Sequence, residues 1–157
     1  MSPKLGKMRV YIGLVLAVFI FNLLTISPVI FVNLGLNKFA KIIYCYFSPL
    51  CHQIDSRSFH INGVKLAVCS RCSLIYFGAL IGVLIFPIVN RHNFVKNGNL
   101  LLIVGLLPSV VEFSLEKFVG LEIVIFKVLS SLFLGGIVGV VLSHQIIDMF
   151  SSKGKIF

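Results

Sequence analysis

The cysteines of this chain are concentrated in one short region, in the pattern C-x5-C-H-x16-C-x2-C. Cys45 and Cys51 precede a polar stretch, and Cys69 and Cys72 follow it. Cysteines that only fill a hydrophobic core would be scattered over the apolar parts of the chain. Thiolates are both metal ligands and redox nucleophiles. The clustering therefore indicates chemistry, and two kinds remain open.

The first kind is metal binding. Cys51, Cys69 and Cys72, together with the imidazole of His52 or His60, provide three sulfurs and one nitrogen, a common tetrahedral zinc set. Cys69 and Cys72 form a CxxC pair at the expected start of a helix, where the helix dipole favours thiolates. We predict a zinc-like site, although Cys51 and His52 are adjacent and converge on one ion only if the segment is irregular.

The second kind is thiol–disulfide exchange. In this alternative Cys69 and Cys72 form one redox pair and Cys45 and Cys51 form another, passing electrons to a membrane acceptor. The layout broadly resembles vitamin K epoxide reductases and disulfide-generating quinone reductases, which are also small helical bundles.

Two charged residues fall inside apolar segments. Glu112 and Lys127 both lie where a membrane span is expected, and charges at that depth are usually paired or functional. We predict an ion pair between them. The alternative is a proton or ion path, which would make the chain a small transporter or channel.

The elements that carry these residues are membrane helices. Of the 157 residues, 58% are hydrophobic and 12% are charged, whereas soluble domains carry roughly 25% charged residues. Positions 10 to 37 contain no charge, which is longer than the ~20 residues that cross a bilayer. We predict an all-α integral membrane domain over 1–157 with four spans, at about 10–34, 67–89, 99–118 and 121–144. The alternative has three spans and a re-entrant third segment, because the third apolar run is short.

The segment at 38–66 between the first two spans differs in composition. Its first part is apolar with Lys38 and Lys41 on one side, which predicts a short helix lying in the membrane interface. Its second part is the most polar stretch of the chain, and Asn62 and Gly63 favour turns. We expect an irregular loop there, followed by a helix from about Ala67.

The remaining patterns concern packing, partners and orientation. Glycines four residues apart, at Gly78 and Gly82 and at Gly135 and Gly139, favour close helix packing within one bundle or, alternatively, a homo-oligomer. The formal charge of +9 suits contact with a lipid bilayer rather than nucleic acid, because the basic residues flank apolar runs. The lysines near both ends form the larger basic group, so we predict a multi-pass protein of the cell membrane with cytoplasmic termini.

One stretch of the sequence resembles a known family. The residues that carry the resemblance are Cys51-His52-Gln53, Arg57-Ser58-Phe59, Gly63, Cys69-x-Arg71-Cys72, Ile75-Tyr76-x-Gly78 and Gly82. This pattern resembles a family of predicted bacterial and archaeal membrane proteins, catalogued as a domain of unknown function and marked by CHQ…RSF…CxRCxGIYxG. The chain departs from it at Ser73-Leu74, where the family usually has a glycine before Ile-Tyr.

The resemblance implies a four-helix membrane fold and gives no enzymatic activity. Its motif includes Cys51, His52, Cys69 and Cys72 but not clearly Cys45 or His60, which favours a Cys3His metal site over two dithiol pairs. The motif residues beside these ligands are expected to orient them and balance their charge. These residues are Gln53, Arg57, Ser58, Arg71 and Tyr76.

Overall fold

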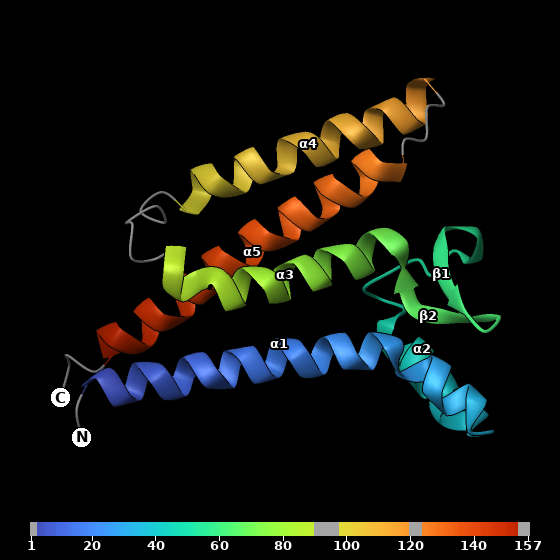
Figure 1. The fold of residues 1–157 in the computed structure, drawn as a ribbon, viewed down its shortest axis with the longest axis horizontal. Coiled ribbons are helices and arrows are strands. Elements are labelled where there is room, and N and C mark those ends of the chain that lie inside the picture. Colours follow the sequence, from blue (N-terminus) through green and yellow to red (C-terminus); the bar gives the residue numbers. More distant parts are fainter. Residues whose placement is uncertain (1–2, 90–97, 120–123, 154–157) are drawn as a thin grey trace.

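The computed structural model describes residues 3–89, 98–119 and 124–153. Figure 1 shows long helices lying side by side, with a small cap at one end of the bundle. In chain order the elements are α1 (Pro3–Asn33), α2 (Asn37–Phe47), a 3-10 turn (Asp55–Arg57), β1 (Ser58–Ile61), β2 (Val64–Cys69), α3 (Ser70–Val89), α4 (Gly98–Val119) and α5 (Val124–Lys153).

Within the described residues, four helices are long and apolar enough to cross a membrane, which confirms the predicted fold class. They are α1, α3, α4 and α5. The third expected span is one continuous helix, so the alternative with a re-entrant third segment is wrong. The predicted start of the fourth span, at 121, lies outside the described residues.

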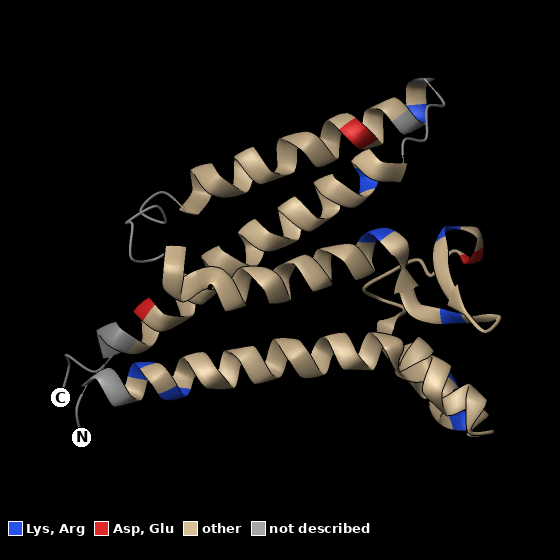
Figure 2. Cartoon of the chain, viewed as in Figure 1, with Lys and Arg blue, Asp and Glu red and all other residues tan. Residues whose placement is uncertain are grey.

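The positions of the charged residues agree with four apolar spans (Figure 2). The middle parts of the long helices carry no charged residues, and the coloured segments lie towards the ends of the bundle and in the cap. The start of α1 and the end of α5 lie at the end of the bundle opposite the cap (Figure 1). Because an even number of spans returns the chain to its starting side, this arrangement is consistent with a multi-pass membrane protein.

Helix α3 packs on α5 through glycines. A Cβ atom added to Gly82 would lie 2.1 Å from the carbonyl oxygen of Gly136, and one added to Gly139 would lie 2.2 Å from that of Ala79. Gly78 is equally tight, at 2.5 Å from a backbone oxygen of α5. The glycine faces of one chain therefore pack against each other. This contact is the close packing within one bundle that we predicted, and the homo-oligomer stays a prediction.

The cap contains a β-hairpin where we predicted an irregular loop. β1 and β2 pair antiparallel, with Ile61 opposite Val64. Asn62 and Gly63 have φ angles of 53° and 77°, as a two-residue hairpin turn requires. The strand continues to Cys69, so α3 begins at Ser70 rather than near Ala67. The turn signal was correct, and the error was to continue the loop through the residues on both sides of it.

A small apolar core joins the cap to the bundle. Phe47 of α2 and Ala67 and Val68 of β2 are fully buried, and Cys51 is nearly so. Phe21 of α1 packs edge-on against Phe47, with ring centroids 5.3 Å apart. This core places the loop after α2 beside the start of α3.

Candidate metal centre

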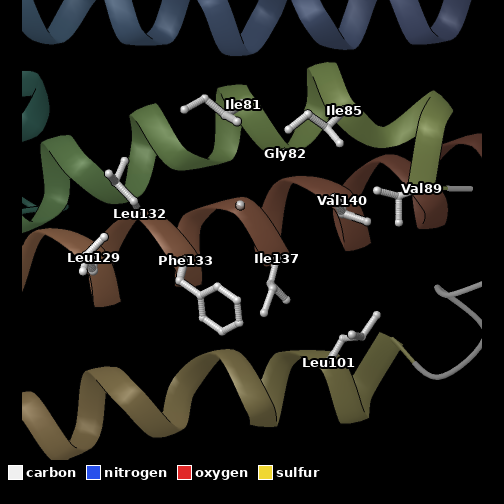
Figure 3. Close-up of a pocket in the computed structure, with 11 residues that line it drawn as sticks. Ile81, Gly82, Ile85, Val89, Leu101, Leu129, Leu132, Phe133, Ile137 and Val140 are labelled. Carbon is white, nitrogen blue, oxygen red and sulfur yellow. The ribbon is translucent and has the colours of Figure 1, made fainter. Parts of the chain in front are cut away.

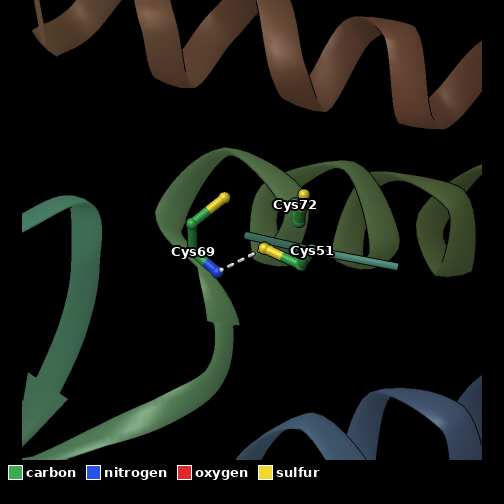
Figure 4. A group of neighbouring side chains, drawn as sticks. All are labelled: Cys51, Cys69 and Cys72. Atoms are coloured by element: carbon green, nitrogen blue, oxygen red, sulfur yellow. Dashed lines mark hydrogen bonds between the residues drawn. The ribbon is translucent and has the colours of Figure 1, made fainter. Parts of the chain in front are cut away.

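Three cysteines from three separate elements meet at the junction of cap and bundle. Cys51 lies in the loop after α2, Cys69 is the last residue of β2, and Cys72 lies in the first turn of α3. Their sulfur atoms all lie within 4.8 Å of one another. Figure 4 shows the three side chains around the start of α3. The packing described above brings them together, although Cys51 is far from the other two in the sequence.

Backbone amides donate hydrogen bonds to the sulfurs of Cys51 and Cys69. The N–H of Cys69 donates a hydrogen bond to the sulfur of Cys51 at 3.2 Å (Figure 4). Cys69 immediately precedes α3, where its sulfur accepts from the amides of Arg71 and Cys72. A hydrogen bond from the Cys72 side chain, together with these amides and Cys51, lowers the pKa of Cys69 to about 5, and burial opposes the shift. The lowered pKa favours the thiolate form of Cys69, which is the form that binds metals.

The donor set fits a zinc ion. With Zn–S bonds of about 2.3 Å, two sulfurs of a tetrahedral site lie about 3.8 Å apart. The observed sulfurs, within 4.8 Å of one another, approach that spacing and need move about 1 Å or less. Three sulfurs on one ion leave the fourth tetrahedral position for another ligand.

His52, the fourth predicted ligand, is not brought into the group. Its side chain is exposed, and the cluster within the described residues contains the three cysteines alone. His52 does line the same cavity, of about 280 Å³, as the three sulfurs. We call this space the sulfur cavity. His52 is therefore near the site and outside its ligand geometry.

Of the residues predicted to support the ligands, Gln53 and Ser58 bond to nearby backbone carbonyls and Tyr76 packs against an aromatic ring. Gln53 adopts a left-handed φ of 49°, and its side-chain amide donates to the carbonyl of Tyr44 at 2.7 Å, which ties the loop to α2. Ser58 donates to the carbonyl of Ile54 at 2.8 Å. Tyr76 packs edge-on against Phe21 at 5.0 Å. These contacts hold the loop and α3 in place.

The two predicted arginines both line the sulfur cavity. Arg71 reaches across to α4, where one of its Nη atoms lies 2.9 Å from both carboxylate oxygens of Glu112. Its guanidinium also lies over the ring of Phe113, 5.5 Å from the centroid. Arg57 comes from the 3-10 turn. The cavity is thus bordered by positive charge.

We predicted that Glu112 pairs with Lys127, and the ion pair that the structure shows at Glu112 is with Arg71. The partner that the structure places against Glu112 is Arg71, and Lys127 lines the sulfur cavity beside it. Glu112 is buried, as predicted, with 6% of its surface exposed. The sequence held a signal for the true partner, because a four-span topology brings the start of the second span and the end of the third to the same membrane face. Phe113 was missed because an aromatic residue in an apolar span carries no distinguishing pattern.

Comparison with known proteins places this site in a family. The model of the DUF2085 family, described as a predicted membrane protein, matches residues 51–145, more than half of the chain. The chain belongs to the DUF2085 family. The DUF2085 match begins at Cys51 and spans all three clustered cysteines, together with α3, α4 and most of α5. Cys45 lies before it.

A second comparison found a relative that is similar to part of this DUF2085 chain. An uncharacterised protein of the archaeon Methanocaldococcus jannaschii is 43% identical over 77 residues, which are 48% of this chain and 49% of the relative. The matched part is therefore about half the length of each protein. No solved structure matches the chain.

Proposed function

We propose that this DUF2085 protein binds one zinc ion at one face of the membrane through Cys51, Cys69 and Cys72. The observation that carries the proposal is the meeting of three sulfurs within 4.8 Å from a loop, a strand end and a helix start. Cysteines used only for packing have no reason to converge from separate elements. The N–H group of Cys69 donates a hydrogen bond to the sulfur of Cys51, which fixes the position of that sulfur beside the other two.

The charges around the site suit such a centre. Three thiolates on Zn²⁺ carry a net charge of about −1. Arg57, Arg71 and Lys127 line the same cavity as the sulfurs. Positive side chains beside a negative metal centre lower its electrostatic cost in a medium of low dielectric constant.

We further propose that the fourth zinc position faces the sulfur cavity. All three cysteines line this cavity, which also contains His52. A zinc ion with three protein ligands has a fourth coordination position for water or a substrate, as in catalytic and metal-transfer sites. If His52 turned inward it would instead close the site and make it structural.

A second candidate is thiol–disulfide exchange, because the same three sulfurs are close enough for thiol chemistry among themselves. The two-pair version needs Cys45 beside Cys51. Cys45 is exposed on α2 and lies outside the described sulfur cluster. A third interpretation, ion transport through Glu112, is weakened because Arg71 holds this carboxylate.

Metal analysis combined with thiol counting tests the proposal. Protein purified in detergent without chelators should contain about one zinc per chain, as one tetrahedral site requires. Cys69→Ser and Cys72→Ser should lose the zinc, and the matched control Cys45→Ser should retain it. His52→Ala should retain zinc if the fourth position is open. Metal-free protein with a disulfide between Cys69 and Cys72 would refute the metal centre and support thiol–disulfide exchange.

A further inference from the structure

Helix α2 presents three different faces along its length. Its inner face, which includes Ala40 and Phe47, is buried against the rest of the protein. A second face carries Phe39, Ile42 and Tyr46, at positions i, i+3 and i+7, and these side chains are 54%, 62% and 59% exposed. At 3.6 residues per turn the three positions fall within about 60° of arc. We call this second face the α2 apolar stripe.

The third face of α2 is cationic. Lys38 and Lys41 are exposed and lie next to the apolar stripe on the helix circumference. The helix contains no acidic residue, and the first acidic residue of the chain is Asp55. The carboxylate of Asp55 lies 3.4 Å from a ring nitrogen of His60 and 3.7 Å from Nζ of Lys65, in the hairpin. Helix α2 therefore combines an exposed apolar face with a local positive charge.

The rotation of α2 about its axis is fixed by contacts with the rest of the cap. The hydroxyl of Tyr44 donates a hydrogen bond to the carbonyl of Lys65 in β2. The N–H of Cys51 donates to the carbonyl of Phe47 at 3.0 Å, so the last turn of α2 leads directly to the sulfur cluster. The apolar stripe and the two lysines are therefore held in a constant direction relative to the bundle.

The apolar stripe continues the surface of α1. The ring of Phe39 lies against that of Phe31 near the end of α1, with centroids 5.9 Å apart. Helix α1 is long and apolar enough to cross a membrane, and Ile26 and Ile30 near its end are exposed. Figure 1 shows α2 at the cap end of the bundle, at an angle to the long helices. An apolar face that continues from a span onto a tilted helix is typical of the bilayer interface.

The surfaces of the long helices differ from that of α2. A groove of about 450 Å³ runs along α5, and each described residue that lines it is aliphatic, aromatic or glycine. Figure 3 shows side chains of α3, α4 and α5 directed into this groove. Such a surface suits hydrocarbon alone. The mixture of apolar and cationic side chains on α2 instead suits the boundary between hydrocarbon and headgroups.

We propose that α2 docks on a bilayer surface that contains anionic phospholipid. The apolar stripe inserts among the upper parts of the acyl chains, and Lys38 and Lys41 contact headgroup phosphates. A bilayer satisfies both faces at once, since burial of the stripe and attraction of the lysines to anionic lipid act in the same direction. The docking does not depend on zinc.

Depth-dependent quenching of tryptophan fluorescence tests the docking, because the sequence contains no tryptophan. Tyr46→Trp places a reporter on the apolar stripe, and Ile42→Trp is a second reporter should the first variant fail to fold. Phe19→Trp, exposed in the middle of α1, is the matched control for the bilayer centre. Each variant is placed as a single copy in phosphatidylcholine nanodiscs whose lipid is brominated near either the carbonyl end or the methyl end of the acyl chain.

We expect bromines near the carbonyl end to quench Tyr46→Trp more strongly than bromines near the methyl end, with the opposite order for Phe19→Trp. The same order at both positions would place α2 at the wrong depth and overturn the proposal. Absence of quenching at both stripe reporters would also overturn it, because the stripe would then face water or a protein partner.

A second measurement tests the headgroup contact. Brominated phosphatidylglycerol replaces brominated phosphatidylcholine as a minor lipid, and its additional quenching of Tyr46→Trp measures the preference of α2 for anionic lipid. Lys38→Gln and Lys41→Gln should each reduce this preference about fivefold, the contribution of one cation near a membrane surface. Lys7→Gln, near the start of α1 at the opposite end of the bundle, is the control and should leave it unchanged. No preference for the anionic lipid, or equal losses in all three lysine variants, would refute the headgroup contact and with it the proposal.

Discussion

The glycine contact between α3 and α5 makes a quantitative prediction about stability. A Cβ added at Gly82 would lie 2.1 Å from the carbonyl oxygen of Gly136 and 2.9 Å from its carbonyl carbon. Ordinary van der Waals contact begins near 3.4 Å, so Gly82→Ala requires a local separation of about 3.4 − 2.1 = 1.3 Å. The atom in the way is backbone, which no side-chain rotation can move.

The expected cost follows from that separation. Overpacking of a tight contact typically costs about 1–3 kcal/mol. Alanine is better than glycine in a helix interior by about 0.5–1 kcal/mol, which offsets part of the loss. Because the clash is with backbone, we expect Gly82→Ala to fall in the upper part of this difference and to destabilise the protein by about 1–2.5 kcal/mol net.

The partner glycine provides the matched control. A Cβ at Gly136 would meet its nearest atom, the carbonyl oxygen of Gly78, at 3.9 Å, which is ordinary contact. Gly136→Ala should therefore be neutral or stabilising by up to about 1 kcal/mol. Gly139→Ala, whose Cβ would lie 2.2 Å from the carbonyl oxygen of Ala79, should behave like Gly82→Ala.

The assay is reversible unfolding in mixed micelles, followed by the far-ultraviolet circular dichroism of the helices. The free energy of unfolding is compared among the three alanine variants and the parent protein. If Gly82→Ala and Gly136→Ala had the same stability, α3 and α5 would not approach as closely as the structure places them. A loss in Gly136→Ala alone would indicate that the glycines face a different partner.

Three further predictions concern the site and its topology. Glu112→Gln and Arg71→Met should each destabilise the protein by about 3 kcal/mol or less, because each change removes one partner of a buried ion pair. The double change should recover much of the loss. Additive losses in the same unfolding assay would contradict the ion pair. Reporter fusions after Phe157 and in the connection between α3 and α4 should both be cytoplasmic, because the basic residues near the chain ends favour that side; an external signal from either would refute this orientation. Cys45, which is exposed, should react with a membrane-impermeant maleimide faster than Cys51, which is buried in the sulfur cluster, and this difference should disappear if the cluster does not form.

Much of the architecture follows from the sequence because a bilayer imposes it. A run of uncharged residues longer than the hydrocarbon thickness must become a helix, since every backbone polar group needs an internal partner. This reasoning predicted four spans without knowledge of their contacts. The CxxC pair could also be placed at a helix start, because the apolar run of the second span begins beside it.

The sequence was less informative about which side chains meet, because these contacts depend on how each helix is rotated about its axis and on the path of each loop. His52 follows Cys51 directly, yet the two side chains diverge: the sulfur is buried in the cluster and the imidazole is exposed. The hairpin after it was hidden because polar residues on a strand resemble those of a loop. Glu112 forms an ion pair with Arg71, whereas we predicted Lys127 as its partner. The partner depends on which faces of the three helices are turned toward one another, and the sequence does not show this.

The sequence alone predicted four helices long and apolar enough to cross a membrane and a cluster of thiols between the first two, because hydropathy and residue spacing are local properties of the chain. The tertiary structure decided which three thiols meet, which cation holds Glu112, and that a groove remains along α5. The apolar core around Phe47 brings the thiols together, and the glycines let α3 approach α5 closely while α4 also packs on α5. The geometry of helix packing, rather than any motif, therefore sets the site and the space beside it.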